Sequence, residues 1–182
     1  MQTHELVAHP AYPPLAAKSV TAKIDAADPH WLRLRWRIEG AGRILVPPFV
    51  GKRRRDGLSR TTCFELFVSS ELGSTPAYSE FNFSPSEAFA AYDFSAYRDD
   101  GRDRDLRIAP DITWRGGSFF AIMDVAMLIS ALPGGPLLFG MTAVIEEEGG
   151  HKSYWAAEHT GETPDFHDRA CFAQTLAAPN RP

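Results

Sequence analysis

The sequence predicts an all-β protein: an antiparallel two-sheet β-sandwich with jelly-roll or Greek-key connections, about ten strands and one short crossover helix. Apolar and polar residues alternate along several segments, which is the pattern of half-buried strands. Glycine- and proline-rich turns separate these segments at spacings that suit hairpins. Helical and strand patterns do not alternate regularly, which disfavours a doubly wound parallel sheet.

The clearest strand covers residues 31–38, where the even positions are apolar and positions 33, 35 and 37 are arginines. Residues 62–68 and 77–83 repeat the pattern, so that Phe64 and Phe81 are expected to face the core and Glu65 and Glu80 the opposite side. Further strands are predicted for residues 19–24, 43–46, 89–97, 106–113, 118–123, 138–146, 152–159 and 171–176.

The crossover helix is predicted over residues 124–132, with Asp124 as a candidate N-cap and Pro133 as its stop. A length of 182 residues predicts one domain over 1–182, with its core at about 15–176. The proline-rich start and the tail after Leu176 are expected to be loosely held.

Composition narrows the classes of partner. A formal net charge of −4 gives no field that would attract nucleic acid or an anionic membrane, so we expect neither as a partner, while a homo-oligomer stays open. Cys63 and Cys171 lie far apart without a metal-binding spacing, which argues against a disulfide framework. With no secretory pattern at the start and no apolar run of membrane-spanning length, we expect a cytoplasmic protein.

Two glutamates lie in the middle of predicted strands. If these strands are neighbours and turn the same face outward, Glu65 and Glu80 share a concave surface with Tyr78, Asn82 and an arginine such as Arg35. The carboxylates would there accept hydrogen bonds from the hydroxyls of a polyol. Alternatively, each carboxylate solubilises the wet face or pairs with an arginine. Two carboxylates about 5 to 9 Å apart would also suit glycoside hydrolysis, a distance that the sequence does not fix.

Aromatic, histidine and acidic side chains gather near the C-terminal end of the sequence. Tyr154 and Trp155 are candidates to stack on a sugar ring, and the histidine His159 is a candidate to hydrogen-bond its rim. For a metal ion, His159, Asp165 and His167 form a possible set whose spacing matches no specific signature. The alternative is that Trp155 fills the core and the histidines bond to the backbone of a loop.

Other motifs add little. The basic run at residues 52–55, with the arginines of residues 33–37, forms either a patch for phosphate or carboxylate groups or a solvated loop. The sequence contains no G-x-S-x-G elbow, no G-x-G-x-x-G loop and no phosphate-cradling Gly-Lys-Ser/Thr loop. An enzymatic activity therefore has no positive support.

Five strings of the sequence form a distinctive set: Asp56-Gly57-Leu58, Thr62-Cys63-Phe64-Glu65-Leu66-Phe67, Tyr78-Ser79-Glu80-Phe81-Asn82-Phe83-Ser84-Pro85, Ser153-Tyr154-Trp155 and Pro164-Asp165-Phe166-His167. With these strings the sequence resembles bacterial DOMON-like domains related to carbohydrate-binding module family 9, over roughly residues 15–176. The resemblance implies a two-sheet antiparallel sandwich that recognises ligands by aromatic and polar side chains on a concave sheet or its rim.

The same resemblance assigns roles to individual positions. Glu65 matches the sugar-contacting glutamate of the relatives, whereas Ser59 stands where they carry a tryptophan that forms one wall of an aromatic clamp. Tyr154 or Trp155 is the expected opposite wall. Haem-binding members need axial Met or His ligands, and no pair is singled out here. Some relatives hold calcium, for which the acidic run at residues 99–105 supplies oxygen ligands unless it is a solvated hairpin turn.

Three hypotheses follow. The first is a non-catalytic β-sandwich that binds a small polar ligand, most plausibly a carbohydrate, through Glu65, Glu80 and Trp155. The second is a protein-interaction or structural module with an exposed sheet. The third is a metal-assisted enzyme that uses His159, Asp165 and His167.

Overall fold

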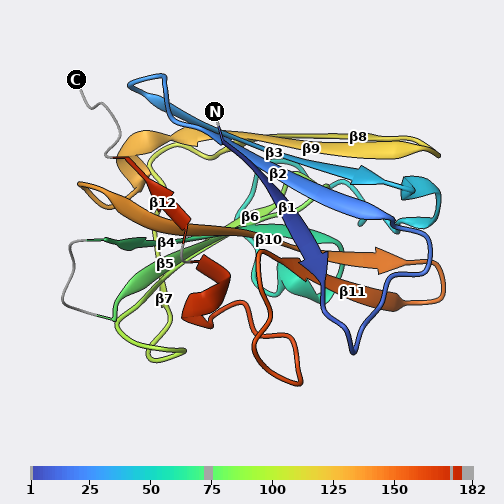
Figure 1. The fold of residues 1–182 in the computed structure, drawn as a ribbon. Helices are drawn as coiled ribbons and strands as arrows, with labels where there is room; N and C mark the ends of the chain where they lie inside the picture. The colour runs from blue at the N-terminus through green and yellow to red at the C-terminus, as the bar shows by residue number, and fades with distance from the viewer. Residues whose placement is uncertain (1, 72–75, 173, 178–182) are drawn as a thin grey trace.

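The computed structural model describes residues 2–71, 76–172 and 174–177 and shows an all-β chain (Figure 1). None of its described helices is long and apolar enough to cross a membrane. The helical turns are η1 (Ala41–Arg43), η2 (Leu58–Arg60), η3 (Ile129–Ala131) and η4 (Arg169–Phe172). The strands are β1 (Gln2–Ala8), β2 (Ser19–Asp25), β3 (Trp31–Glu39), β4 (Cys63–Ser70), β5 (Tyr78–Phe83), β6 (Phe89–Phe94), β7 (Arg102–Asp103), β8 (Asp111–Gly116), β9 (Phe120–Leu128), β10 (Leu137–Glu147), β11 (His151–Ala156) and β12 (Gln174–Leu176).

The strands form one curled antiparallel sheet in the order β7-β6-β5-β4-β10-β11-β1-β2-β3-β9-β8, and β12 pairs with β10. Two halves of this sheet face each other, and β1 joins them because it pairs with β2 along its length and with β11 at Val7 and Ala8 (Figure 1). The predicted all-β antiparallel class is confirmed. The architecture is a curled half-barrel, however, and the expected pair of separate sheets is not clearly present.

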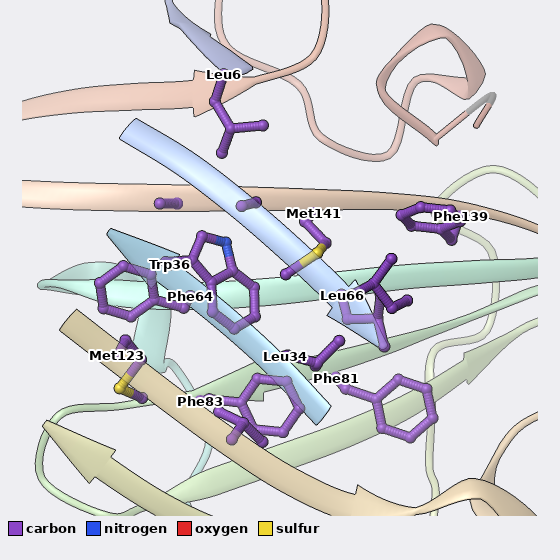
Figure 2. Packing of buried hydrophobic residues seen from close by; sticks show 14 of the residues in the cluster. Leu6, Leu34, Trp36, Phe64, Leu66, Phe81, Phe83, Met123, Phe139 and Met141 are labelled. Atoms are coloured by element: carbon purple, nitrogen blue, oxygen red, sulfur yellow. The ribbon is translucent and has the colours of Figure 1, made fainter. Parts of the chain in front are cut away.

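The core fills the space between the two halves of the sheet. Trp36 of β3 packs against Phe64 of β4 and Phe83 of β5, with ring centroids 5.4 and 6.3 Å apart (Figure 2). These side chains are fully buried, as the alternation in residues 31–38, 62–68 and 77–83 predicts. Burial of large aromatic and aliphatic side chains at this density is the main stabilising contribution to such a fold.

The predicted crossover helix over residues 124–132 is wrong. Residues up to Leu128 belong to β9, which lies between β3 and β8, and only a short 3₁₀ turn, Ile129–Ala131, follows. Met123, Val125 and Met127 alternate inward with a period of two, so β-pairing on both sides outweighs the helix propensity of methionine and alanine.

The N-terminal segment is also more firmly anchored, by burial and hydrogen bonds, than the sequence predicts. Leu6 of β1 is buried in the core, outside the expected limit of residue 15. The fully buried carboxylate of Glu147 then fixes the proline-rich turn, because it accepts the backbone N–H groups of Leu15, Ala16 and Ala17 at 2.7, 2.7 and 3.1 Å. In the tail after Leu176, residues 178–182 lie outside the described residues.

The remaining differences concern the ends of strands. Residues 43–46 form a turn and a single bridge at Ile44, the strand predicted at 106–113 lies at β8, and residues 171 and 172 belong to η4. In each case the sequence pattern located the apolar residues. It did not locate the turn that precedes or follows them.

Candidate functional site

The site begins with the pairing of β4 and β5. Glu65 lies opposite Asn82, and Phe67 lies opposite Glu80, so the two glutamates point away from the core on the same face of the sheet. The expected convergence of the two carboxylates is therefore present. Their face is the outside of the curled sheet, because the core lies between its two halves. The expected concavity of this sheet surface stays a prediction.

The C-terminal segment covers this outer face and makes a cleft of it. The turn η4 packs on β10 at Gly140, where a Cβ atom would lie 2.1 Å from the carbonyl oxygen of Cys171. Phe166 and Phe172 join Phe67 in a second apolar cluster beneath the segment. Between sheet and segment lies a cleft of about 180 Å³, lined by Ser59, Glu65, Glu80, Arg98, Val144, Tyr154, Pro164, Phe166 and His167. We call it the acidic cleft.

The two glutamates of the acidic cleft are deeply buried. Glu65 is 3% exposed and accepts the Thr142 hydroxyl at 3.3 Å, and Glu80 accepts the Asn82 side-chain amide at 2.6 Å. Burial raises the pKa of Glu65 well above its ordinary value, and the nearby charge of Glu80 raises it further. Burial also raises the pKa of Glu80. The pair therefore favours a state that retains a proton, in which the protonated carboxyl can donate a hydrogen bond to a ligand and the ionised carboxyl can accept one.

His167 completes the polar lining and is neutral at pH 7. Burial and the positive charge of Arg98 lower its pKa to about 4. The Tyr78 hydroxyl accepts the backbone N–H of Arg98 at 3.1 Å and has its own proton to donate to His167 Nδ1, 2.7 Å away. The ring proton then resides on Nε2, which lies 3.7 Å from a carboxylate oxygen of Glu80.

An ion pair holds the wall of the acidic cleft. Arg98 donates to Asp165 at 2.7 Å, and the hydroxyl of Tyr97 donates to the same carboxylate. Arg98 adopts a left-handed backbone conformation, with φ of 53°, which is uncommon for a non-glycine residue. This contact ties the loop after β6 to the C-terminal segment.

Tyr154, and not Trp155, is the aromatic residue of β11 that reaches the cleft. Tyr154 lies opposite Val144 on the same face as Glu65, and its ring is 6.2 Å from that of Phe166. Trp155 points into the core, is 4% exposed and donates its indole N–H to Ser153. The expectation that Trp155 opens onto the site is wrong, because alternation along a strand sends neighbouring side chains to opposite faces.

Other predicted residues lie at the margin of the acidic cleft or away from it. Tyr78 and Asn82 stand behind it as hydrogen-bond partners of His167 and Glu80. His159 packs against His9 and bonds to the carbonyl of Val7. It does not line the acidic cleft.

Arg35 lies on the other half of the sheet, where it donates to Asp124 at 2.6 Å. It lines a larger hollow of about 500 Å³ over β2, β3, β8 and β9. Arg115 bonds to the same Asp124 carboxylate, and Asp111 pairs with Lys52 from the basic run. We favour the acidic cleft over this hollow because its carboxyl groups are buried, whereas the charged side chains of the hollow are exposed or half-buried, and three of them, Arg35, Arg115 and Asp124, pair with one another.

The predicted metal set is not assembled. His167 faces Glu80 and Tyr78, Asp165 is engaged by Arg98, and His159 lies apart. Among residues 2–71, 76–172 and 174–177, no three His, Cys, Asp or Glu side chains gather closely enough to hold a metal ion. In the acidic run at 99–105, Asp100 pairs with Arg102.

Two lining residues of the acidic cleft, Arg98 and Val144, lie outside every motif that the sequence analysis singled out. Arg98 lies in a loop without periodicity, and Val144 is an apolar residue between Ala143 and Ile145 of β10. Ser59 does line the cleft, at the position where the resemblance expects a tryptophan. Val144 could have been found from the alternation of β10, but the position of Arg98 depends on its tertiary contact with Asp165.

Comparison with solved structures shows what the fold resembles. A Bacteroides uniformis protein to which carbohydrate binding is ascribed superposes with a TM-score of 0.69 at 17% identity, covering 97% of this chain and 85% of the other. Two structures of a family 9 carbohydrate-binding module from Caldicellulosiruptor kristjanssonii also superpose. The complex with cellotriose gives a TM-score of 0.57 at 8% identity, covering 98% and 84% of the two chains. The complex with glucose gives 0.51 at 10% identity, covering 97% and 80%.

No family model and no curated protein matches the sequence. At these identities the superpositions establish the fold alone. The chain thus shares the fold of carbohydrate-binding proteins that include a family 9 module, and its resemblance to DOMON-like domains stays a prediction.

Proposed function

We propose that this protein is a non-catalytic binding module that holds a carbohydrate in the acidic cleft. The observation that carries the proposal is the convergence of Glu65, Glu80, His167 and Tyr154 on one hollow. The fold supports it, because structures with the same fold include a module in complex with cellotriose and with glucose.

The groups of the acidic cleft suit the hydroxyls of a sugar. Each hydroxyl both donates and accepts a hydrogen bond, and the Glu65–Glu80 pair offers both functions in a dry environment. His167 Nε2 adds a donor, and the Arg98 guanidinium adds several. Tyr154 supplies the aromatic surface that sugar rings stack against, so a ligand meets polar groups at its rim and an aromatic ring at its face.

The missing clamp residue limits the expected affinity. Ser59 offers no ring, so the position that the resemblance gives to one wall of an aromatic clamp carries no aromatic side chain. One stacked ring contributes about 0.5 to 1.5 kcal/mol beyond its burial, and loss of translational and rotational freedom opposes it. We therefore expect micromolar or weaker binding.

Isothermal titration calorimetry tests the proposal. Purified protein is titrated with glucose, xylose, mannose, galactose and their disaccharides at millimolar concentration. Binding of at least one sugar is expected, with a loss of affinity in Glu80→Gln because the stronger acceptor is removed. Arg35→Gln is the matched control, since Arg35 is a charged residue outside the cleft. No heat with any sugar, or equal losses in both variants, would refute saccharide binding in the acidic cleft.

A further inference from the structure

A second hollow adjoins the acidic cleft. It measures about 370 Å³ and is lined by Pro76, Tyr78, Tyr97, Asp165, His167, Asp168 and Arg169. His167 lines both hollows, so one imidazole ring stands between them. We call this space the outer hollow. None of its lining residues is among Ser59, Glu65, Tyr154 and Trp155, the positions to which the resemblance assigns a role.

A single layer of side chains separates the two spaces. The adjacent residues Tyr97 and Arg98 line the outer hollow and the acidic cleft, respectively. Both side chains bond to the carboxylate of Asp165, which lines the outer hollow. The wall is therefore made of His167 and the Arg98–Asp165 ion pair, and a ligand that extends past this wall enters the outer hollow.

Like the acidic cleft, the outer hollow combines an aromatic ring with side chains that donate hydrogen bonds. Tyr97 is 58% exposed, which is unusual for a large aromatic side chain that also has a hydrogen-bonded hydroxyl. Arg169 is fixed by Ser69 at 2.7 Å and by the ring of Phe172, 5.0 Å from its guanidinium carbon. An exposed aromatic face beside an ordered guanidinium offers stacking and hydrogen-bond donors to a neutral, hydroxylated ring.

Size argues in the same direction. Pockets for drug-sized ligands measure about 300 to 1,000 Å³, and the acidic cleft at about 180 Å³ lies below that range. The acidic cleft alone therefore suits a small ligand such as one sugar ring. The outer hollow, at about 370 Å³, adds the space that a second ring needs.

We propose that the outer hollow is a second saccharide subsite, so that the ligand is an oligosaccharide of at least two units with Tyr97 as the stacking platform of the second unit. This inference rests on the proposed function, because it assumes that the first unit occupies the acidic cleft. It goes further because it assigns an oligosaccharide as the class of ligand. It also identifies Tyr97 as the residue that determines the preference for a disaccharide over a monosaccharide.

The test compares each monosaccharide with its own disaccharide. Wild-type protein is titrated by calorimetry with glucose and cellobiose, xylose and xylobiose, and mannose and mannobiose. For the sugar that binds, we expect the disaccharide to bind roughly 2- to 12-fold more tightly, the range that one further stacked ring supplies. The same titrations on Tyr97→Ala should bring the ratio of the two dissociation constants close to one.

Two variants make the result specific to the ring of Tyr97. Tyr97→Phe keeps the ring and loses the hydrogen bond to Asp165, so it should keep the wild-type ratio. Phe119→Ala removes an aromatic side chain that is 85% exposed at the start of β9, away from both hollows, and should also keep it. We compare the ratio of the dissociation constants for monosaccharide and disaccharide, and not either constant alone, because Tyr97 contacts the wall of the acidic cleft.

The outcomes separate this inference from the proposed function. Equal affinity for monosaccharide and disaccharide, or a ratio that Tyr97→Ala leaves intact, overturns the second subsite while saccharide binding stands. Absence of binding by every sugar overturns both.

Discussion

Replacing Glu65 with glutamine tests how this buried carboxyl affects the stability of the fold. Glu65 is 3% exposed and shares its cleft with Glu80, so the ionised form of its carboxyl is poorly solvated and the folded state favours the protonated form. Glutamine has nearly the same shape, can accept the Thr142 hydroxyl with its oxygen and can donate to Glu80 with its amide. We therefore expect Glu65→Gln to be more stable than wild type at neutral and alkaline pH.

The sign and size follow from the raised pKa of Glu65. At pH values between the ordinary pKa of Glu65 in the unfolded chain and its raised pKa in the fold, the folded state holds more protons than the unfolded state. Wild-type stability therefore falls as pH rises through this interval. Each unit by which these two pKa values differ removes about 1.4 kcal/mol from the free energy of unfolding of wild type. The variant escapes this loss because glutamine does not titrate. Each kcal/mol corresponds to about 2 to 4 °C in Tm for a chain of this size. The advantage of the variant should grow with pH and vanish below about pH 4.

The assay is urea unfolding of both proteins from pH 4 to pH 9, followed by circular dichroism. Glu71→Gln is the matched control, because Glu71 is an exposed glutamate that directly follows β4 and does not line the acidic cleft. A variant that is less stable than wild type at pH 8, or a difference that is constant across the range, would contradict the account of a strained buried carboxyl pair.

Three further predictions concern residues around the site. Glu147→Ala should lower the free energy of unfolding by about 3 to 5 kcal/mol in urea unfolding, because three backbone N–H groups lose a buried charged acceptor; a loss under 1 kcal/mol would show that this anchor contributes little. His167, whose pKa falls from 6.5 to about 4 on folding, should contribute a loss of about 3 kcal/mol between pH 7 and pH 4, because the unfolded chain takes up a proton that the folded state excludes; the contribution is the difference between the pH profiles of wild type and His167→Gln, and identical profiles would refute its neutral state. Tyr154→Ala should weaken saccharide affinity roughly 2- to 12-fold in calorimetry, and unaltered affinity would exclude stacking on this ring.

The sequence predicts the all-β class because its strongest signal is local. The alternation of residues 31–38, 62–68 and 77–83 survives in β3, β4 and β5 with the expected sides buried. The pairing of β1 with β11 is not local, because these strands are far apart in the chain, whereas β1 and β2 are consecutive. Nothing in the alternation of single strands therefore distinguishes a curled half-barrel from two separate sheets.

The candidate site was predictable to the same extent. Glu65 and Glu80 share a face because of strand alternation, and Tyr154 follows by the same rule once β11 is in register. Trp155 was misplaced by one residue, which in a strand means the opposite face. Arg98 enters the acidic cleft only through its ion pair with Asp165, 67 positions away in sequence, and no pattern near Arg98 indicates it.

The most direct measurement for the proposed site is a map of backbone amide shifts in nuclear magnetic resonance, recorded while the tightest-binding saccharide is added. We predict that the largest changes occur at Glu65, Tyr154 and His167, with little change at Arg35 and Asp124 on the other half of the sheet. Changes concentrated at Arg35 and Asp124 would contradict the assignment of the acidic cleft as the place where this protein holds its ligand.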